Sequence, residues 1–246
     1  MHQIDLPFVC PLIFDLAANK KPGSCFYEAT MKLNIFDSRY KVFDKPVYIT
    51  KPVLPDLDKF TSMIKPIFDS GILTNSGPFS LQLESRLREY LGVQDCALFC
   101  NGTTALQLAI SSYRLSGEII TTPFTFPATI HVIAWNQITP VFCDIDPESY
   151  NIDASQIEQL ITTKTTAILP VHAYGVPCDV RAIERIAQRH GLKVIYDAAP
   201  AFGVKYGGVP VGNYGDTSMF SFHATKLFTT FEGGALTSSD KYFMER

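Results

Sequence analysis

Residues 167–197 read AILPVHAYGVPCDVRAIERIAQRHGLKVIYD, and this stretch decides the fold. It holds two short apolar runs, at 167–171 and 194–197, on either side of a window with helical periodicity at 179–190. Apolar strands that alternate with helices are typical of a parallel sheet whose two faces are both covered. The stretch therefore predicts a strand, a crossing helix and a second strand parallel to the first.

The same alternation continues in both directions along the chain. Further apolar runs lie at 96–100, 119–122, 140–144, 218–222 and 234–237, with further helical windows at 103–115, 127–136 and 153–161. Upstream of these, the pattern predicts two more helices, at 55–69 and 80–91. The predicted fold class is α/β, with a mainly parallel sheet and helices on both faces.

The first 45 residues differ from the rest of the chain. They show little periodicity and contain a break, KKPG, at 20–23. We therefore expect an irregular N-terminal leader at 1–45, followed by one large domain at 46–246.

The composition argues against several classes of partner. The 246 residues carry 21 basic and 24 acidic side chains, a net charge of −3, which lacks the basic surplus that nucleic-acid binding needs. No apolar run is long enough to span a bilayer, and the first residues lack the basic region of a secretory signal. Six scattered cysteines without a C-x-x-C pair indicate free thiols rather than disulfides or a metal site. We expect a cytoplasmic protein with neither a nucleic-acid nor a membrane partner.

Ligands of such sheets bind at the carboxyl ends of the strands, so the residues that follow each run are candidates. In NGTTAL at 101–106, Gly102 and Thr103 stand at a predicted helix start and suit a phosphate; ordinary capping by Thr103 or Thr104 is the alternative. The turn is neither a Walker loop nor G-x-G-x-x-G, so it gives no support to an ATP or NAD site. After the next run, Phe124 and Phe126 either stack on a flat ring or pack in the core.

Two charged residues lie in apolar surroundings at the ends of later runs. Asp197 closes a strongly apolar strand, and it is either a helix N-cap or a carboxylate that pairs with a cation or with an N–H that it keeps protonated. Lys226 carries the one formal charge between Thr217 and Phe231, so it is either a snorkelling lysine or a nucleophilic amine. A phosphate turn, a stacking ring, a strand-end carboxylate and a semi-buried lysine are the parts that hold pyridoxal 5'-phosphate.

Eight motifs, in register, resemble those of the DegT/DnrJ/StrS family of nucleotide-sugar aminotransferases, which are fold type I pyridoxal-phosphate enzymes. They are GILTNSGP (71–78), NGTTAL (101–106), PFTFPAT (123–129), DIDP (144–147), PVHAYG (170–175), YDAA (196–199), SFHATK (221–226) and EGGAL (232–236). The resemblance runs from about residue 48 to the end of the chain, and eight motifs in order are far more specific than any one.

The resemblance implies a role for each candidate residue. Lys226 would be the Schiff-base lysine, Asp197 would pair with the pyridine nitrogen, and Phe126 would stack on the cofactor ring. The cofactor's phosphate would be held by Gly102, Thr103 and Ser221. The implied reaction, in a homodimer, moves an amino group, usually from glutamate, to a keto group of a nucleotide-linked deoxysugar for cell-surface glycan or related sugar synthesis.

The sequence departs from the family pattern in three places. Pro200 stands where the family commonly has a Gln or His that bonds to the cofactor's phenolic oxygen, so that donor is absent or supplied elsewhere. The chain ends twenty residues after Lys226, whereas the family continues into a small C-terminal domain, so we expect a fragment of a complete enzyme. The segment 1–45 has no counterpart in the family.

Two alternatives to the aminotransferase stay open on the sequence. One is the dehydratase branch of the family, which lacks the Schiff-base lysine and is disfavoured by Lys226. The other is a non-catalytic family member that binds and regulates a full-length partner.

Overall fold

The computed structural model describes residue 48 and residues 50–245. The predicted leader at 1–45 lies outside these described residues. One compact unit begins at Thr50 and extends through the rest of the chain.

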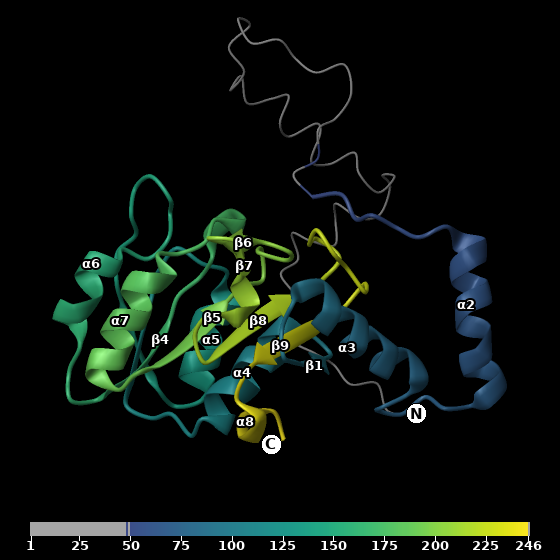
Figure 1. Ribbon diagram of the computed structural model, residues 1–246, viewed down its shortest axis with the longest axis horizontal. Helices are drawn as coiled ribbons and strands as arrows, with labels where there is room; N and C mark the ends of the chain where they lie inside the picture. The colour runs from purple at the N-terminus through teal and green to yellow at the C-terminus, as the bar shows by residue number, and fades with distance from the viewer. Residues whose placement is uncertain (1–47, 49, 246) are drawn as a thin grey trace, which may run out of the picture. The chain divides into compact units, whose positions relative to one another are not determined.

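Helices and strands alternate over residues 78–197 of this unit (Figure 1). The α-helices are α2 (Leu57–Ser70), α3 (Pro78–Leu91), α4 (Gly102–Ser112), α5 (Pro127–Trp135), α6 (Ala154–Ile157), α7 (Val180–His190) and α8 (Lys241–Met244). The strands of the main sheet are β1 (Asp95–Phe99), β2 (Glu118–Thr121), β3 (Thr139–Phe142), β4 (Thr165–Leu169), β5 (Lys193–Asp197), β8 (Thr217–Ser221) and β9 (Gly234–Ser238). A separate hairpin pairs β6 (Lys205–Tyr206) with β7 (Val209–Pro210).

The main sheet has seven strands in the order β1-β9-β8-β5-β4-β2-β3. Each neighbouring pair from β3 to β8 is parallel, and β9 runs antiparallel to both β8 and β1. The predicted fold class, a mainly parallel α/β sheet, is therefore confirmed. The sequence pattern did not indicate the reversed direction of β9, because an apolar run reads alike in either direction.

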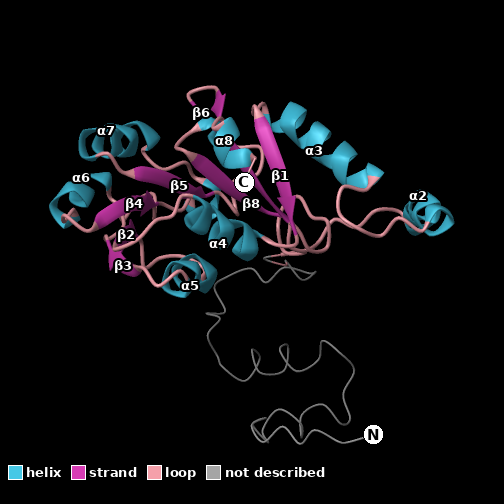
Figure 2. Cartoon of the chain, turned by 90° about the horizontal axis from the view of Figure 1, so that it is seen from below, coloured by secondary structure: helices cyan, strands magenta, loops and turns pink. Residues whose placement is uncertain are grey.

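Both faces of the sheet are covered, as the apolar runs predict. On β5, Ile195 packs into a core with α4 and α5, while Val194 and Tyr196 pack into a second core with α6 and α7. A third core lies between α3 and the β8–β9 side of the sheet. Figure 2 shows α3 and α7 on one side of the sheet and α4 and α5 on the other.

Local signals in the sequence explain where the helices begin and end. The Asp179 carboxylate accepts a hydrogen bond from the Ala182 amide at 3.0 Å, which caps the start of α7. Gly191 ends the same helix in the left-handed region, with φ of 65°. The predicted helix at 153–161 proves to be the short α6 followed by a 3-10 turn, Glu158–Leu160.

None of the helices in the described part of the chain has the length and apolar character that crossing a membrane requires.

Candidate functional site

The candidate residues gather at one edge of the sheet. Strands β2, β4, β5 and β8 run parallel, so their carboxyl ends and the loops that follow them meet at the same edge. The residues singled out from the sequence lie at these strand ends, in the loops that follow them, or at the start of α4.

Asp197 is the last residue of β5 and only 5% of it is exposed. One carboxylate oxygen accepts a hydrogen bond from the Thr129 hydroxyl at 2.7 Å, and the other accepts one from the Ala199 amide at 3.0 Å. Burial raises the pKa of Asp197, while these two hydrogen bonds and the positive charge of Lys226 act in the opposite direction. A carboxylate can accept about four hydrogen bonds, so Asp197 retains capacity for another donor.

The alternative in which Asp197 caps a helix is wrong. No helix follows β5, and the residues after Asp197 form turns. The carboxylate instead reaches Thr129, 68 positions earlier in the chain. Thr129 was not among the predicted site residues, although it closes the PFTFPAT motif that follows β2.

Lys226 lies in the loop between β8 and β9 and is partly buried. Its backbone amide donates a hydrogen bond to the His223 carbonyl at 2.9 Å, which turns the chain back toward β9. The charge of Lys226 acts on the Asp197 carboxyl. The two residues are 29 positions apart in the sequence, and the fold places Lys226 near enough for its charge to act on this carboxyl.

The start of α4 lies against the carboxyl end of β8. A Cβ atom placed on Gly102 would stand 2.7 Å from the Met219 sulfur and 3.2 Å from the Ser221 Cβ, so a side chain does not fit at this position. Gly102, Thr103 and Ser221 are thereby brought together beside the free amides of a helix N-terminus. The cap of α4 is Asn101, whose side chain accepts from the Thr104 amide at 2.8 Å, and not Thr103 or Thr104.

The two phenylalanines of the β2–α5 loop are not core residues. Phe126 is 75% exposed and Phe124 is 38% exposed, which rules out the alternative of two buried aromatics. Phe126 immediately precedes α5 and lies three residues before Thr129, the hydrogen-bond partner of Asp197. Stacking of Phe126 on a cofactor ring stays a prediction.

His172 and Pro200 lie in the loops beside Asp197. The His172 amide donates to the Asp197 carbonyl at 3.0 Å, and its fully buried ring stacks on Tyr196. The ring nitrogen Nδ1 accepts from the Cys178 amide, and burial lowers the pKa of His172 to about 4, so the ring is neutral at pH 7. Pro200 is exposed, and its carbonyl lies close to Gly175 in the loop after β4.

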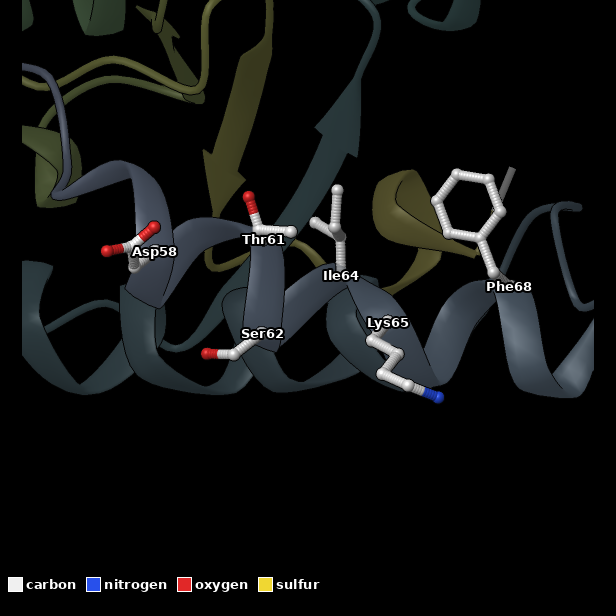
Figure 3. A pocket seen from close by; sticks show the side chains of 6 residues that line it. All are labelled: Asp58, Thr61, Ser62, Ile64, Lys65 and Phe68. Atoms are coloured by element: carbon white, nitrogen blue, oxygen red, sulfur yellow. The ribbon is translucent and has the colours of Figure 1, made fainter.

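A hollow of about 420 Å³ lies along α2. Figure 3 shows its lining, which comes entirely from that one helix: Asp58, Thr61, Ser62, Ile64, Lys65 and Phe68. This hollow contains none of the residues gathered at the sheet edge.

The assembled groups define the chemistry of a fitting ligand. Buried Asp197 suits a positively charged N–H donor, because the low surrounding dielectric makes an unpaired carboxylate costly. The helix start at Gly102 suits a phosphate, and the Lys226 amine suits a reactive carbonyl. Pyridoxal phosphate carries all three of these groups, so the residues fit this cofactor.

Comparisons of sequence point to one family. The profile of the DegT/DnrJ/EryC1/StrS aminotransferase family matches residues 56–246. The chain is 49% identical over 203 residues to a dTDP-4-amino-4,6-dideoxy-D-glucose transaminase of Shigella dysenteriae, a match that covers 82% of this chain and 55% of that protein. It is 39% identical, with the same coverage, to a GDP-perosamine synthase of Escherichia coli O157:H7.

Solved structures agree with this result. The structure of DesI in the presence of its TDP-sugar product matches with a TM-score of 0.78 and 38% identity, over 82% of this chain and 51% of that one. NtdA of Bacillus subtilis with bound cofactor PMP matches with a TM-score of 0.71 and 31% identity, over 76% of this chain and 42% of that one. The chain spans about half the length of the relatives it matches.

Proposed function

The chain belongs to the DegT/DnrJ/EryC1/StrS aminotransferase family, and on that premise we propose that it binds pyridoxal phosphate and transfers an amino group to a nucleotide-linked keto sugar. The observation that carries this proposal is Asp197, a buried carboxylate with spare acceptor capacity that is subject to the charge of Lys226. A structural role alone gives no reason to bury a carboxylate that lacks a full set of donors.

Each residue then has a chemical task. Asp197 accepts a hydrogen bond from the pyridine N–H and keeps that nitrogen protonated, so that the bound ring withdraws electrons from the reacting carbon. Phe126 holds the ring by stacking, and the α4 start with Gly102, Thr103 and Ser221 binds the phosphate. The Lys226 amine anchors the cofactor and then moves the proton at the carbon that gains or loses the amino group.

The substrate assignment rests on the relatives. Two of them are named for a dTDP-linked and a GDP-linked sugar, which supports a nucleotide-linked deoxysugar as the amino acceptor. We further propose glutamate as the amino donor, a homodimer as the active assembly, the cytoplasm as the location, and residues 46–246 as the cofactor-binding domain. The chain spans about half the length of these relatives, so amino transfer to a nucleotide-linked sugar is a proposal that concerns the whole protein.

Amino transfer from isotope-labelled glutamate to a dTDP-4-keto-6-deoxysugar tests the proposal. We expect labelled amino sugar from the unaltered protein, and a loss of at least about 100-fold for Lys226→Ala, because both anchoring and proton transfer are removed. Lys205→Ala is the matched control, since Lys205 is an exposed lysine on β6. Undiminished transfer by Lys226→Ala would refute the assignment.

A further inference from the structure

Three exposed aromatic side chains meet beside the candidate site. Phe124 follows β2, Tyr150 follows β3 and Tyr174 follows β4, the three neighbouring strands at one end of the sheet (Figure 2). The ring centroid of Phe124 lies 5.6 Å from that of Tyr150 and 5.9 Å from that of Tyr174, and the two tyrosine rings are 6.1 Å apart. Loops that are far apart in the sequence thus present one aromatic surface, which we call the aromatic platform.

A buried asparagine fixes two of these loops to each other. Asn151 directly follows Tyr150, and only 2% of it is exposed. Its side-chain amide donates to the Val176 carbonyl at 3.1 Å and to the Pro177 carbonyl at 3.2 Å, and its oxygen accepts from the Ala173 amide at 2.8 Å. Both sides of Tyr174 are therefore tied to the residue next to Tyr150, which holds the platform in place before any ligand arrives.

The backbone is strained at both tyrosines. Tyr150 has φ of 60° and Tyr174 has φ of 53°, in the left-handed region that bulky residues rarely adopt. Such a conformation costs about 1–3 kcal/mol for each residue and persists where the surroundings over-determine it. The side chains gain little burial in return, since Tyr150 is 46% and Tyr174 is 75% exposed. Strained and exposed aromatic rings indicate a binding role rather than a packing role.

The platform is connected to the candidate catalytic centre. Thr125, next to Phe124, has its hydroxyl 2.7 Å from that of Thr129, which donates to Asp197. On the Tyr174 side, a Cβ atom on Gly175 would stand 2.9 Å from the Pro200 carbonyl, so this loop lies against the turn that follows Asp197. The platform therefore flanks the site on the β4–β2–β3 side, whereas Lys226 follows β8 on the other side of β5.

We propose that Phe124, Tyr150 and Tyr174 bind the base of a nucleotide-linked substrate by stacking. This inference rests on the proposed function, in which the sugar reacts at Lys226 and the base lies at the far end of the same molecule. Aromatic faces suit any base, because every base has a flat π-face, and the two tyrosines also carry a hydroxyl each. The platform supplies affinity at a distance from the reacting carbon.

Calorimetric titration with dTDP, GDP and pyrophosphate tests the platform. Tyr174→Ala is the main variant, because a side chain that is 75% exposed can be removed with little effect on folding. Loss of one stacking contact is expected to weaken nucleotide binding by about tenfold and to leave pyrophosphate binding unchanged. Tyr174→Phe keeps the ring and is expected to bind nucleotide as the unaltered chain does. Phe124→Ala is expected to weaken nucleotide binding in the same way.

Three results would overturn the platform. The first is equal nucleotide affinity in the unaltered chain, Tyr174→Ala and Phe124→Ala. The second is no measurable binding of dTDP or GDP to the unaltered chain. The third is a change in oligomeric state in these variants with unchanged nucleotide affinity, which would make the surface a contact between copies of the chain. Pyridoxyl labelling of Lys226, measured separately, tests the proposed function itself, so the failure of either inference can be told from failure of the other.

Discussion

Asp197 illustrates how one residue links burial to binding. Burial removes water from its carboxyl group and raises its pKa. The two hydrogen bonds that the carboxylate accepts lower the pKa but do not cancel this rise. In the absence of a ligand, a charged Asp197 therefore lowers the free energy of unfolding. A protonated ring nitrogen would supply the missing partner. Cofactor binding would then be favoured, because it relieves the free-energy cost of burying an unpaired carboxylate.

Substitution of Asp197 by Asn tests this view. The amide keeps the shape and can accept from Ala199, but carries no charge. We expect Asp197→Asn to raise the melting temperature of the cofactor-free chain at pH 7. Because the folded-state pKa is raised, the gain should shrink as the pH falls through that pKa and disappear below about pH 4, where the unfolded carboxyl is also protonated. The same variant should bind pyridoxal phosphate about tenfold more weakly or worse.

The comparison needs two checks. His172, whose pKa burial lowers to about 4, destabilises the folded chain as the pH falls below 6.5, but this effect is common to both proteins and cancels in their difference. Asp69→Asn is the control, since this exposed carboxylate pairs with Lys65 on the surface of α2 and its loss should change stability by less than about 1 kcal/mol. A pH-independent gain for Asp197→Asn would contradict the argument.

At the scale of elements, the loops depend on side chains that the apolar pattern does not reveal. We expect Asn151→Ala to lower the free energy of unfolding by about 2–3 kcal/mol, because three hydrogen bonds are lost and buried backbone groups remain unpaired. Urea denaturation measures this change. Asn213→Ala is the matched control, since Asn213 also bonds to two carbonyls, of Gly92 and Pro210, but is exposed to water. Equal losses for the two variants would mean that Asn151 does not hold the loops together.

The sequence predicted the long elements well and the short ones poorly. Each apolar run corresponds to a strand of the main sheet within two residues at either end, because buried strands need continuous apolar residues. The β6–β7 hairpin and the short helix α8 were not predicted, since elements of two to four residues leave no periodicity to detect.

At the scale of the whole molecule, the candidate site is a product of topology. Asp197 and Lys226 were singled out from the sequence because each is a charge in apolar surroundings, and the Gly102 turn because the free amides of a helix start suit a phosphate. Thr129 and His172 were not, because a hydroxyl and a ring look unremarkable until the fold brings them beside Asp197. The aromatic platform was missed for the same reason, since its three rings meet only through tertiary structure.

Covalent labelling of Lys226 tests the central claim most directly. The chain is incubated with pyridoxal phosphate, reduced with borohydride and digested, and the modified peptide is identified by mass spectrometry. The account predicts a pyridoxyl group on Lys226 and its loss in Lys226→Arg, because arginine stays protonated and cannot attack the cofactor aldehyde. A pyridoxyl group on another lysine, with none on Lys226, would contradict the account.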